Sequence, residues 1–225
     1  MVGLFVTGTG TDVGKTYVTA ALVRAMRDYG VDVDVLKPVV SGFDPGRPAG
    51  SDPAVLLEAL GTPLSDQTLD WISPWRFSEP LSPPLAAKLE GRILVASDVA
   101  ELCRLRLAAS VEGVLLIEGA GGVMSPLDDD HTMLDLAVAV DLPVLVVAGS
   151  YLGSISHTLT AVQVLRSRTT QPLAVVVSHS VEGPPIGPTL EALHRLIADV
   201  PVFEVLRGGP APSRLLRWVD ETTAE

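Results

Sequence analysis

The sequence predicts a single three-layer α/β domain over residues 1–225, with a mostly parallel sheet between two layers of helices. Short apolar runs rich in β-branched residues alternate along the chain with longer segments of helical pattern. This alternation is typical of a parallel sheet whose strands are joined by helices. The apolar runs are continuous rather than alternating with polar residues, which indicates strands that are covered on both faces.

These patterns predict a strand or a helix in twelve places. The strands are expected at 4–7, 31–37, 113–118, 144–148, 173–178 and 202–205. The helices are expected between them, at 15–29, 52–60, 98–110, 132–140, 156–167 and 188–199. The proline-containing segment 73–84 is predicted to be a long connection, and loops of that length are usually functional. A domain boundary there would leave neither half with a complete sheet.

The composition narrows the classes of function. The chain has 225 residues, 47% apolar and 19% charged, which suits a folded core and excludes disorder or a coiled coil. A formal net charge of −11 should repel polyphosphate backbones and anionic lipid, so neither nucleic acid nor a membrane is expected as a partner. A single bound nucleotide remains compatible, because local N–H groups, one lysine and a metal ion can hold its phosphates.

The cysteine content and the hydropathy also exclude several classes. Cys103 is the only cysteine, so there can be no intrachain disulfide and no cysteine-based zinc site. No segment reaches the ~18 consecutive apolar residues that a membrane-spanning helix needs. The N-terminal residues lack the basic region of a signal peptide. We therefore expect a cytoplasmic protein.

A glycine-rich segment, GTGTDVGKT at residues 8–16, joins the first expected strand to the first expected helix. Such glycines let successive N–H groups turn inward around a β-phosphate, and the helix N-terminus adds a favourable dipole. Lys15 could then bridge the β- and γ-phosphates of a nucleoside triphosphate, with the Thr16 hydroxyl on Mg²⁺. Gly8 and Gly14 enclose five residues instead of the standard four. The alternative is a glycine-rich turn that carries a lysine by chance.

Two further strand ends carry charged residues. Lys37 ends the second expected strand, and Glu118 ends the third, just before the glycines of 119–122. The carboxyl ends of parallel strands line the ligand crevice, so both side chains are expected near the phosphates. Glu118 is expected to bind a metal, because burying a carboxylate without a partner is costly. For Lys37, the sequence supports equally a lysine that points into solvent.

With these segments, the sequence resembles the dethiobiotin synthetase family, whose members have a P-loop NTPase-type fold. The resemblance covers most of the chain in the expected order. The extended loop spacing and the Lys37-Pro38-Val39 strand end are marks of the family. The matching segments are 6–16, 36–39, 41–42, 51–52, 76–83, 118–122, 126–127 and 152–157.

The resemblance implies an ATP- and Mg²⁺-dependent cyclo-ligase of biotin biosynthesis. Family members join CO₂ to 7,8-diaminopelargonic acid and give dethiobiotin, ADP and phosphate, through a carbamate and a carbamic–phosphoric anhydride. By this resemblance Lys15, Lys37 and Thr11 are catalytic, since pre-placed cations stabilise charge on the transferring phosphoryl group and the carbamate. Thr16, Asp52 and Glu118 would hold Mg²⁺ through oxygen atoms only, which suits a hard cation.

The same resemblance implies the binding residues. Thr11, Lys37 and Ser41 would contact the carbamate or the diamino acid. The family is homodimeric, and the substrate carboxylate meets a helix start of the other subunit, which corresponds here to Gly153, Ser154, Ile155 and Ser156. An ordinary helix cap by Ser154 or Ser156 fits the sequence equally. The nucleotide would contact Asp12, Val13, Gly14, Lys15, Thr16, Tyr17, Asp52, Glu118, Gly119, Ala120, Gly121, His179, Ser180, Val205, Leu206 and Arg207.

The chain departs from the family pattern at a few of these positions. Gly10 is commonly Asp in the family. His179 replaces an Asn that usually contacts adenine, and the family often has Ile-Pro where this chain has residues 204–207, EVLR. The last two changes fall in the base-binding region, so the preference among triphosphates stays open at this point.

Two other classes share part of the pattern. A ParA- or MinD-like switch protein has the same fold and dimerises on ATP, but it normally carries a lysine where this chain has Gly10. Such switches often end in a membrane-binding amphipathic helix, which is not expected in the short, acidic segment 214–225. A small-molecule kinase would need an arginine-rich lid, which the sequence lacks. Both alternatives predict ATP turnover that is indifferent to diaminopelargonic acid and bicarbonate.

Overall fold

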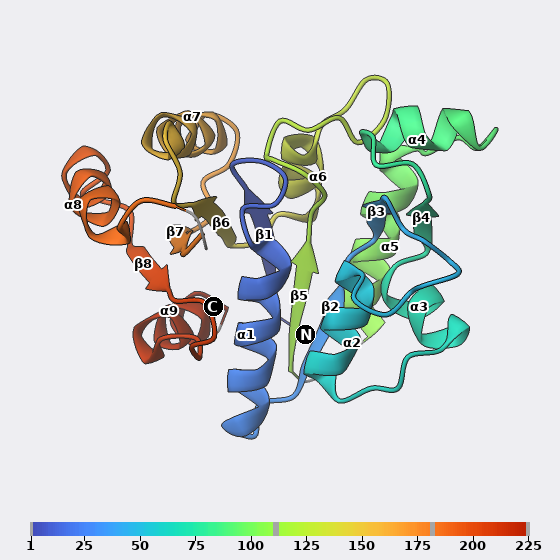
Figure 1. The fold of residues 1–225 in the computed structure, drawn as a ribbon, viewed down its shortest axis with the longest axis horizontal. Coiled ribbons are helices and arrows are strands. Elements are labelled where there is room, and N and C mark those ends of the chain that lie inside the picture. Colours follow the sequence, from blue (N-terminus) through green and yellow to red (C-terminus); the bar gives the residue numbers. More distant parts are fainter. Residues whose placement is uncertain (1, 110–112, 181–182, 224–225) are drawn as a thin grey trace.

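The computed structural model describes residues 2–109, 113–180 and 183–223. Within these ranges, six strands form the central sheet in the order β2-β5-β1-β6-β7-β8 (Figure 1). All neighbouring strands of this sheet run parallel, which confirms the predicted parallel sheet. The strands are β1 (Val2–Gly8), β2 (Val33–Leu36), β5 (Val114–Glu118), β6 (Val144–Gly149), β7 (Leu173–Ser178) and β8 (Val202–Val205).

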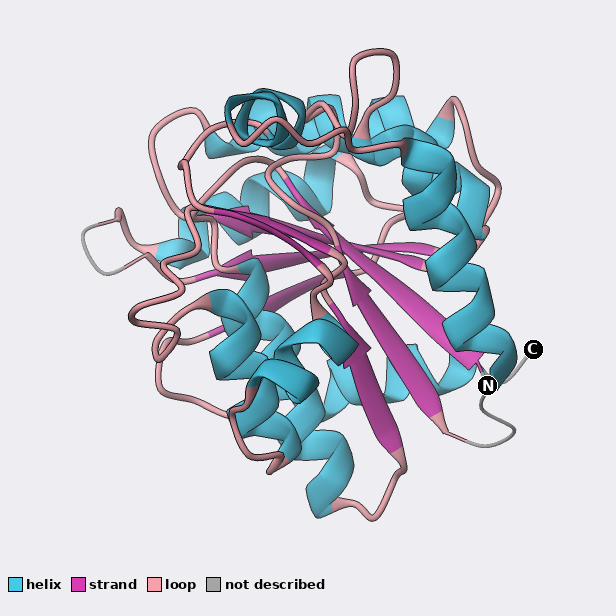
Figure 2. Cartoon of the chain, turned by 90° about the vertical axis from the view of Figure 1, so that its right-hand side faces the viewer, coloured by secondary structure: helices cyan, strands magenta, loops and turns pink. Residues whose placement is uncertain are grey.

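Helices cover both faces of this sheet (Figure 2). Along β1, Leu4 and Val6 pack against one layer of helices, and Phe5 between them packs against the other. The strands are therefore apolar on both faces, which explains their continuous apolar runs. One layer contains α1 (Lys15–Asp28), α2 (Asp52–Leu60) and α9 (Ser213–Thr223). The other contains α5 (Ala96–Ala109), α6 (Met133–Val140), α7 (Ser154–Arg166) and α8 (Ile186–Leu196).

The expected strands and helices are all present, and their ends differ from the predicted ones by at most three residues. The predicted helix 98–110 is α5, and its last predicted residue, Ser110, lies outside the described residues. Of the predicted domain 1–225, residues 1, 110–112, 181–182 and 224–225 lie outside them as well.

The prediction that 73–84 is one long connecting loop is wrong. This segment contains β4 (Trp75–Phe77) and the start of α4 (Pro83–Leu89), and it follows α3 (Asp66–Ile72). β4 pairs in parallel with β3 (Val39–Ser41), so these two strands form a separate small sheet beside the main one. Strands of three residues are too short to show an apolar period, which is why the sequence did not reveal them.

The C-terminal segment contains a helix for which the sequence analysis predicted no element. Residues 213–223 form α9, an amphipathic helix. Its apolar residues Leu215 and Val219 are fully buried in the core layer that α1 and α2 share. The apolar face of α9 is thus occupied by the chain's own core. Among the described helices, none combines the length and the apolar character needed to cross a membrane.

Candidate functional site

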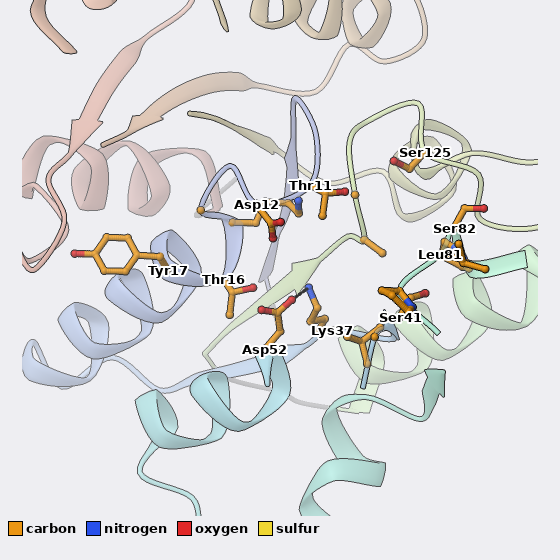
Figure 3. A pocket seen from close by; sticks show the side chains of 18 of the residues that line it. Thr11, Asp12, Thr16, Tyr17, Lys37, Ser41, Asp52, Leu81, Ser82 and Ser125 are labelled. Carbon is orange, nitrogen blue, oxygen red and sulfur yellow. Dashed lines mark ion pairs between the residues drawn. The ribbon is translucent and has the colours of Figure 1, made fainter. Parts of the chain in front are cut away.

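Three adjacent strand ends meet at one edge of the main sheet. β5 lies between β1 and β2, so the loop after β1, Lys37 after β2 and Glu118 at the end of β5 come together, as expected for parallel strands. A cavity of about 850 Å³ lies at this edge (Figure 3). The predicted site residues that line it are Thr11, Asp12, Gly14, Lys15, Thr16, Tyr17, Lys37, Ser41, Asp52, Ala120, Gly121 and Arg207.

The glycine-rich loop is held by hydrogen bonds to the strands around it. The Thr9 N–H donates to the carbonyl of Val147 at 2.9 Å, and the Val123 N–H donates to the carbonyl of Gly8 at 2.8 Å. The loop ends at Gly14, which precedes α1 with a left-handed φ of 95°. The Lys15 side chain turns back over the loop, and its Nζ donates to the Gly10 carbonyl at 2.7 Å. This ammonium group is therefore held where the loop's own N–H groups would surround a phosphate.

The electrostatic surroundings of Lys15 favour an anionic ligand. Burial lowers the pKa of Lys15, the Lys37 ammonium lowers it in the same direction, and together they bring it to about 8 despite nearby carboxylates. The two ammonium groups thus repel each other in a site that is partly shielded from water. An anion bound between them would relieve that repulsion and stabilise the charged form of Lys15.

Replacing Gly14 by alanine should damage this loop. A Cβ at this position would lie 2.5 Å from Ser178 Oγ, on a backbone that L residues rarely adopt. We expect the free energy of unfolding to fall by about 1–2 kcal/mol, which denaturant titration would measure. Gly187→Ala is the matched control, because its Cβ meets no atom within 4 Å and its φ is ordinary. Equal stability of the two variants would contradict this account of the loop.

Lys37 and Glu118 form a buried ion pair at the base of the cavity. Lys37 is 2% exposed and Glu118 is fully buried. The Lys37 Nζ lies 2.6 Å from Glu118 Oε1 and 3.0 Å from Asp52 Oδ2, and Figure 3 shows the Lys37 and Asp52 side chains pointing toward one another. The Thr16 hydroxyl donates to the same Glu118 Oε1 at 2.6 Å. The alternative of a Lys37 side chain in solvent is therefore wrong.

The carboxylates keep Lys37 charged. Burial acts to lower the pKa of Lys37, but the charges of Glu118 and Asp52 outweigh burial and raise it above its ordinary value. For Asp52, burial acts to raise the pKa, and the Lys37 ammonium outweighs it, so that the pKa is lowered. Lys37 and Asp52 are consequently both ionised at neutral pH.

Two buried oxygens beside this cluster lack a hydrogen-bond partner among the described residues. They are Glu118 Oε2 and Ser41 Oγ. Leaving a buried polar atom unpaired costs about 1–3 kcal/mol, more for a charged group. Ser41 lines the cavity, whereas Glu118 lies behind the lining and contacts two residues of it, Lys37 and Thr16. Unpaired oxygens at a polar cavity indicate a place where a ligand or an ion completes the set.

At the other end of the cavity, Tyr17 connects α1 to the loop after β8. The Tyr17 hydroxyl donates to the carbonyls of Leu206 at 2.9 Å and Gly209 at 3.3 Å. The guanidinium of Arg207 lies over the Tyr17 ring, 5.8 Å from its centre. Tyr17 and Arg207, which are both among the residues expected to contact the nucleotide, line the cavity.

The other residues expected around the base make contacts within the protein. Val205 is part of the core. The His179 N–H donates to the Val205 carbonyl at 3.1 Å. The backbone N–H groups of Ser150 and Ser180 donate to each other's hydroxyls at 3.2 and 3.0 Å. None of these side chains belongs to the cavity lining, and neither do Val13, Glu118, Gly119 and Leu206.

The segment Gly153–Ser156 begins α7 and lies outside the cavity lining of its own chain. Gly153 occupies the N-cap position with a φ of 96°, and no side chain caps the helix. The Ser154 hydroxyl donates instead to the Gly149 carbonyl. The alternative of an ordinary cap by Ser154 or Ser156 is therefore wrong. The preceding residue, Leu152, is 99% exposed.

The structure adds residues that the sequence analysis did not select. Pro80, Leu81, Ser82 and Pro83 form one wall of the cavity at the start of α4. The additional lining residues elsewhere are Val40, Gly42 and Ser125. A signal existed for the 80–83 wall, since the segment 73–84 was expected to be functional. Val40 is placed by the short sheet of β3 and β4, which had no such signal, whereas Gly42 belongs to the matching segment 41–42.

Comparisons with known proteins agree with this geometry. The family model described as AAA domain matches residues 2–206. A protein of Caulobacter sp. strain K31 named ATP-dependent dethiobiotin synthetase BioD is 52% identical over 208 residues, which cover 92% of this chain and 89% of that protein. A protein of the same name from Phenylobacterium zucineum is 49% identical and covers 92% and 89% of the two chains.

Solved structures support the fold. The MinC:MinD cell division protein complex of Aquifex aeolicus matches with a TM-score of 0.54 at 12% identity, over 99% of this chain and 86% of that chain. The signal recognition particle receptor FtsY of Elizabethkingia anophelis matches with a TM-score of 0.53 at 16% identity, over 89% of this chain and 57% of that chain. At such low identity, these likenesses show the fold alone. The identity to the two synthetases over most of the chain shows that this chain belongs to the dethiobiotin synthetase family of P-loop proteins.

Proposed function

We propose that this chain synthesises dethiobiotin from 7,8-diaminopelargonic acid, CO₂ and ATP. Its relatives are named ATP-dependent dethiobiotin synthetases. The observation that carries the proposal is the pair of cations at one cavity. Lys15 closes a phosphate-type loop, and Lys37 is buried beside it with its ammonium at the cavity base. A reaction that gathers a triphosphate and a carbamate in one place needs both charges.

The chemistry divides into three steps in this proposal. The lone pair of one substrate amine attacks CO₂, and loss of a proton leaves an N-carboxylate, the carbamate. A carbamate oxygen then attacks the γ-phosphorus of ATP, the bond to the β-phosphate oxygen breaks, and ADP leaves. The second amine finally attacks the carbonyl carbon, phosphate departs, and a second proton is lost as the ureido ring closes.

In these steps, side chains of the protein stabilise negative charge and hold the substrates in position. Lys15 holds the β- and γ-phosphates, and Lys37 neutralises the oxygens shared by carbamate and phosphoryl group. Thr11 and Ser41 donate hydrogen bonds to the carbamate. No strong general base is required, because the nucleophiles are the substrate's own amine and carbamate.

The oxygen donors at the cavity base fit Mg²⁺. Thr16, Asp52 and Glu118 offer one hydroxyl and two carboxylates, and Glu118 Oε2 is buried without a partner among the described residues. Hydroxyl and carboxylate oxygens are the ligands that this hard cation prefers. When bound, the ion would neutralise charge on the phosphates. We propose that these three side chains hold it.

We further propose that the enzyme acts as a homodimer whose substrate site is shared between subunits. The N-terminal turn of α7 lacks a side-chain cap and lies outside the cavity of its own chain. Helix N-termini bind carboxylates through free N–H groups and the helix dipole. Its neighbour Leu152 is 99% exposed. A second copy would cover this apolar residue and bring the helix start to the substrate's carboxylate.

ATP turnover with and without each substrate tests the proposal. We expect ADP release to require both diaminopelargonic acid and bicarbonate, and mass spectrometry to find dethiobiotin in equal amount. A switch protein or a small-molecule kinase would hydrolyse or transfer phosphate without that double requirement. Turnover that is indifferent to either substrate would reject the proposed reaction.

A further inference from the structure

We propose that Ser125 is a substrate-positioning residue, whose hydroxyl donates a hydrogen bond to a carbamate oxygen. The inference rests on the proposed function, since it concerns the carbamate formed in that reaction. Ser125 lines the cavity, on the loop that follows β5. Figure 3 shows it on the same side of the cavity as Thr11.

The Ser125 side chain can take its position because Gly121 has no side chain. A Cβ on Gly121 would lie 2.2 Å from Ser125 Oγ and 3.8 Å from Thr11 Oγ1. The φ of Gly121 is +65°, which also disfavours any L side chain. The Ser125 hydroxyl therefore occupies the space that a side chain at position 121 would need, and the Thr11 hydroxyl of the phosphate loop lies on the same side of Gly121.

The Ser125 hydroxyl is fixed in position and keeps its proton available. Its Oγ accepts the Gly122 N–H at 2.7 Å. The Ser125 N–H donates to the Gly122 carbonyl at 2.9 Å, and its carbonyl accepts the Met133 N–H at the start of α6, also at 2.9 Å. Among the hydrogen bonds between described residues, the hydroxyl accepts this one and donates none. A hydroxyl has one proton to give, so this proton is free for a ligand.

The positive charges at the cavity indicate which acceptor the Ser125 hydroxyl binds. Lys15 and Lys37 line the same cavity and favour an anionic ligand. The loop that carries Ser125 also touches the phosphate loop, because a Cβ on Gly122 would lie 3.1 Å from the Gly10 nitrogen. Ser125 thus lies beside the phosphate site, where the carbamate must approach the γ-phosphate. An anionic oxygen of the carbamate accepts a hydrogen bond better than a neutral group would.

The test compares wild-type enzyme with Ser125→Ala. We expect kcat/KM for diaminopelargonic acid to fall about 10- to 100-fold, as for a lost hydrogen bond to a charged group, while the Kd for ATP stays unchanged in calorimetry. Carbon-13 NMR with labelled bicarbonate, without ATP, should show less enzyme-bound carbamate. Ser125→Thr keeps the hydroxyl and should restore the signal. Ser167→Ala, an exposed serine at the far end of α7, is the matched control and should behave as wild type.

Each other outcome overturns the inference. An equal loss of ATP affinity in Ser125→Ala would mean that the hydroxyl serves the phosphate loop or a γ-phosphate oxygen instead. Unchanged kinetics and carbamate signal would mean that it contacts no substrate. If Ser125→Ala does not fold, Ser125→Cys, a weak donor of similar size, takes its place with the same expected losses. Absence of dethiobiotin with the wild-type enzyme would reject the proposed function, and the inference with it, and is recognised before any variant is compared.

Discussion

Lys37→Ala should lower kcat by about 100-fold or more and destabilise the protein at the same time. The loss of turnover follows because a preorganised cation in a closed site is worth a few kcal/mol in the transition state. The loss of stability follows because Glu118 is fully buried and pairs with Lys37 at 2.6 Å. Removing one partner of a buried pair costs about 3–5 kcal/mol, since it strands the other charge. Steady-state kinetics and denaturant titration measure the two effects separately.

A double variant separates the structural effect from the catalytic one. Lys37→Met with Glu118→Gln removes both charges and keeps similar volumes, so we expect most of the lost stability to return. Turnover should stay low, because neither charge is restored. Near-normal turnover of Lys37→Ala would remove this lysine from the mechanism. A double variant as unstable as the single one would show that the pairing does not control stability.

Lys15→Met should weaken ATP binding by about 30-fold or more, corresponding to roughly 2 kcal/mol for a lost charged contact. The wild-type affinity should also depend on pH, because the pKa of Lys15 is lowered to about 8 by burial and by Lys37. Below this pH the ammonium is present and binds phosphate. Above it the free enzyme loses the proton, so the affinity for ATP should fall as pH rises. Calorimetry between about pH 7 and pH 10 measures both effects.

The lowered pKa of Lys15 also makes the stability of the folded protein depend on pH. The unfolded chain keeps its Lys15 proton up to the ordinary pKa of 10.5, whereas the folded protein releases it near 8. The charged form is thus a cost to folding below pH 8. This cost disappears as pH rises from about 8 to 10.5, where the contribution of this residue to stability increases. In Lys15→Met both the pH dependence of affinity and this contribution should vanish, and a variant that keeps them would assign the titration to another group.

The fold was largely predictable because the apolar pattern of this chain is simple. Residues such as Phe5 and Val6 in β1 face opposite helical layers, so the strands appear as unbroken apolar runs. The three-residue strands β3 and β4 are too short for any pattern. The helix α9 had a detectable signal, because Leu215 and Val219 are one helical turn apart. Because the segment is short and ends in acidic residues, the sequence analysis predicted no helix there.

The site was predictable where a backbone rule fixes the position and unpredictable where tertiary pairing decides it. Parallel strand ends must meet at one edge, so Lys37 and Glu118 could be placed near the phosphate loop. Whether Lys37 was buried could not be predicted, since this depends on Asp52 of α2 as a third partner. Ser125 could not be found either, because its role depends on the missing side chain of Gly121.

The transfer of oxygen from CO₂ to phosphate tests the central claim, that the carbamate itself attacks ATP. The enzyme would be supplied with oxygen-18-labelled CO₂, diaminopelargonic acid and unlabelled ATP, and the released phosphate analysed by mass spectrometry before exchange with water. If a carbamate oxygen bonds to the γ-phosphorus and the carbon–oxygen bond then breaks, each phosphate carries one labelled oxygen and the ureido carbonyl keeps the other. Phosphate without label, formed alongside dethiobiotin, would contradict this account.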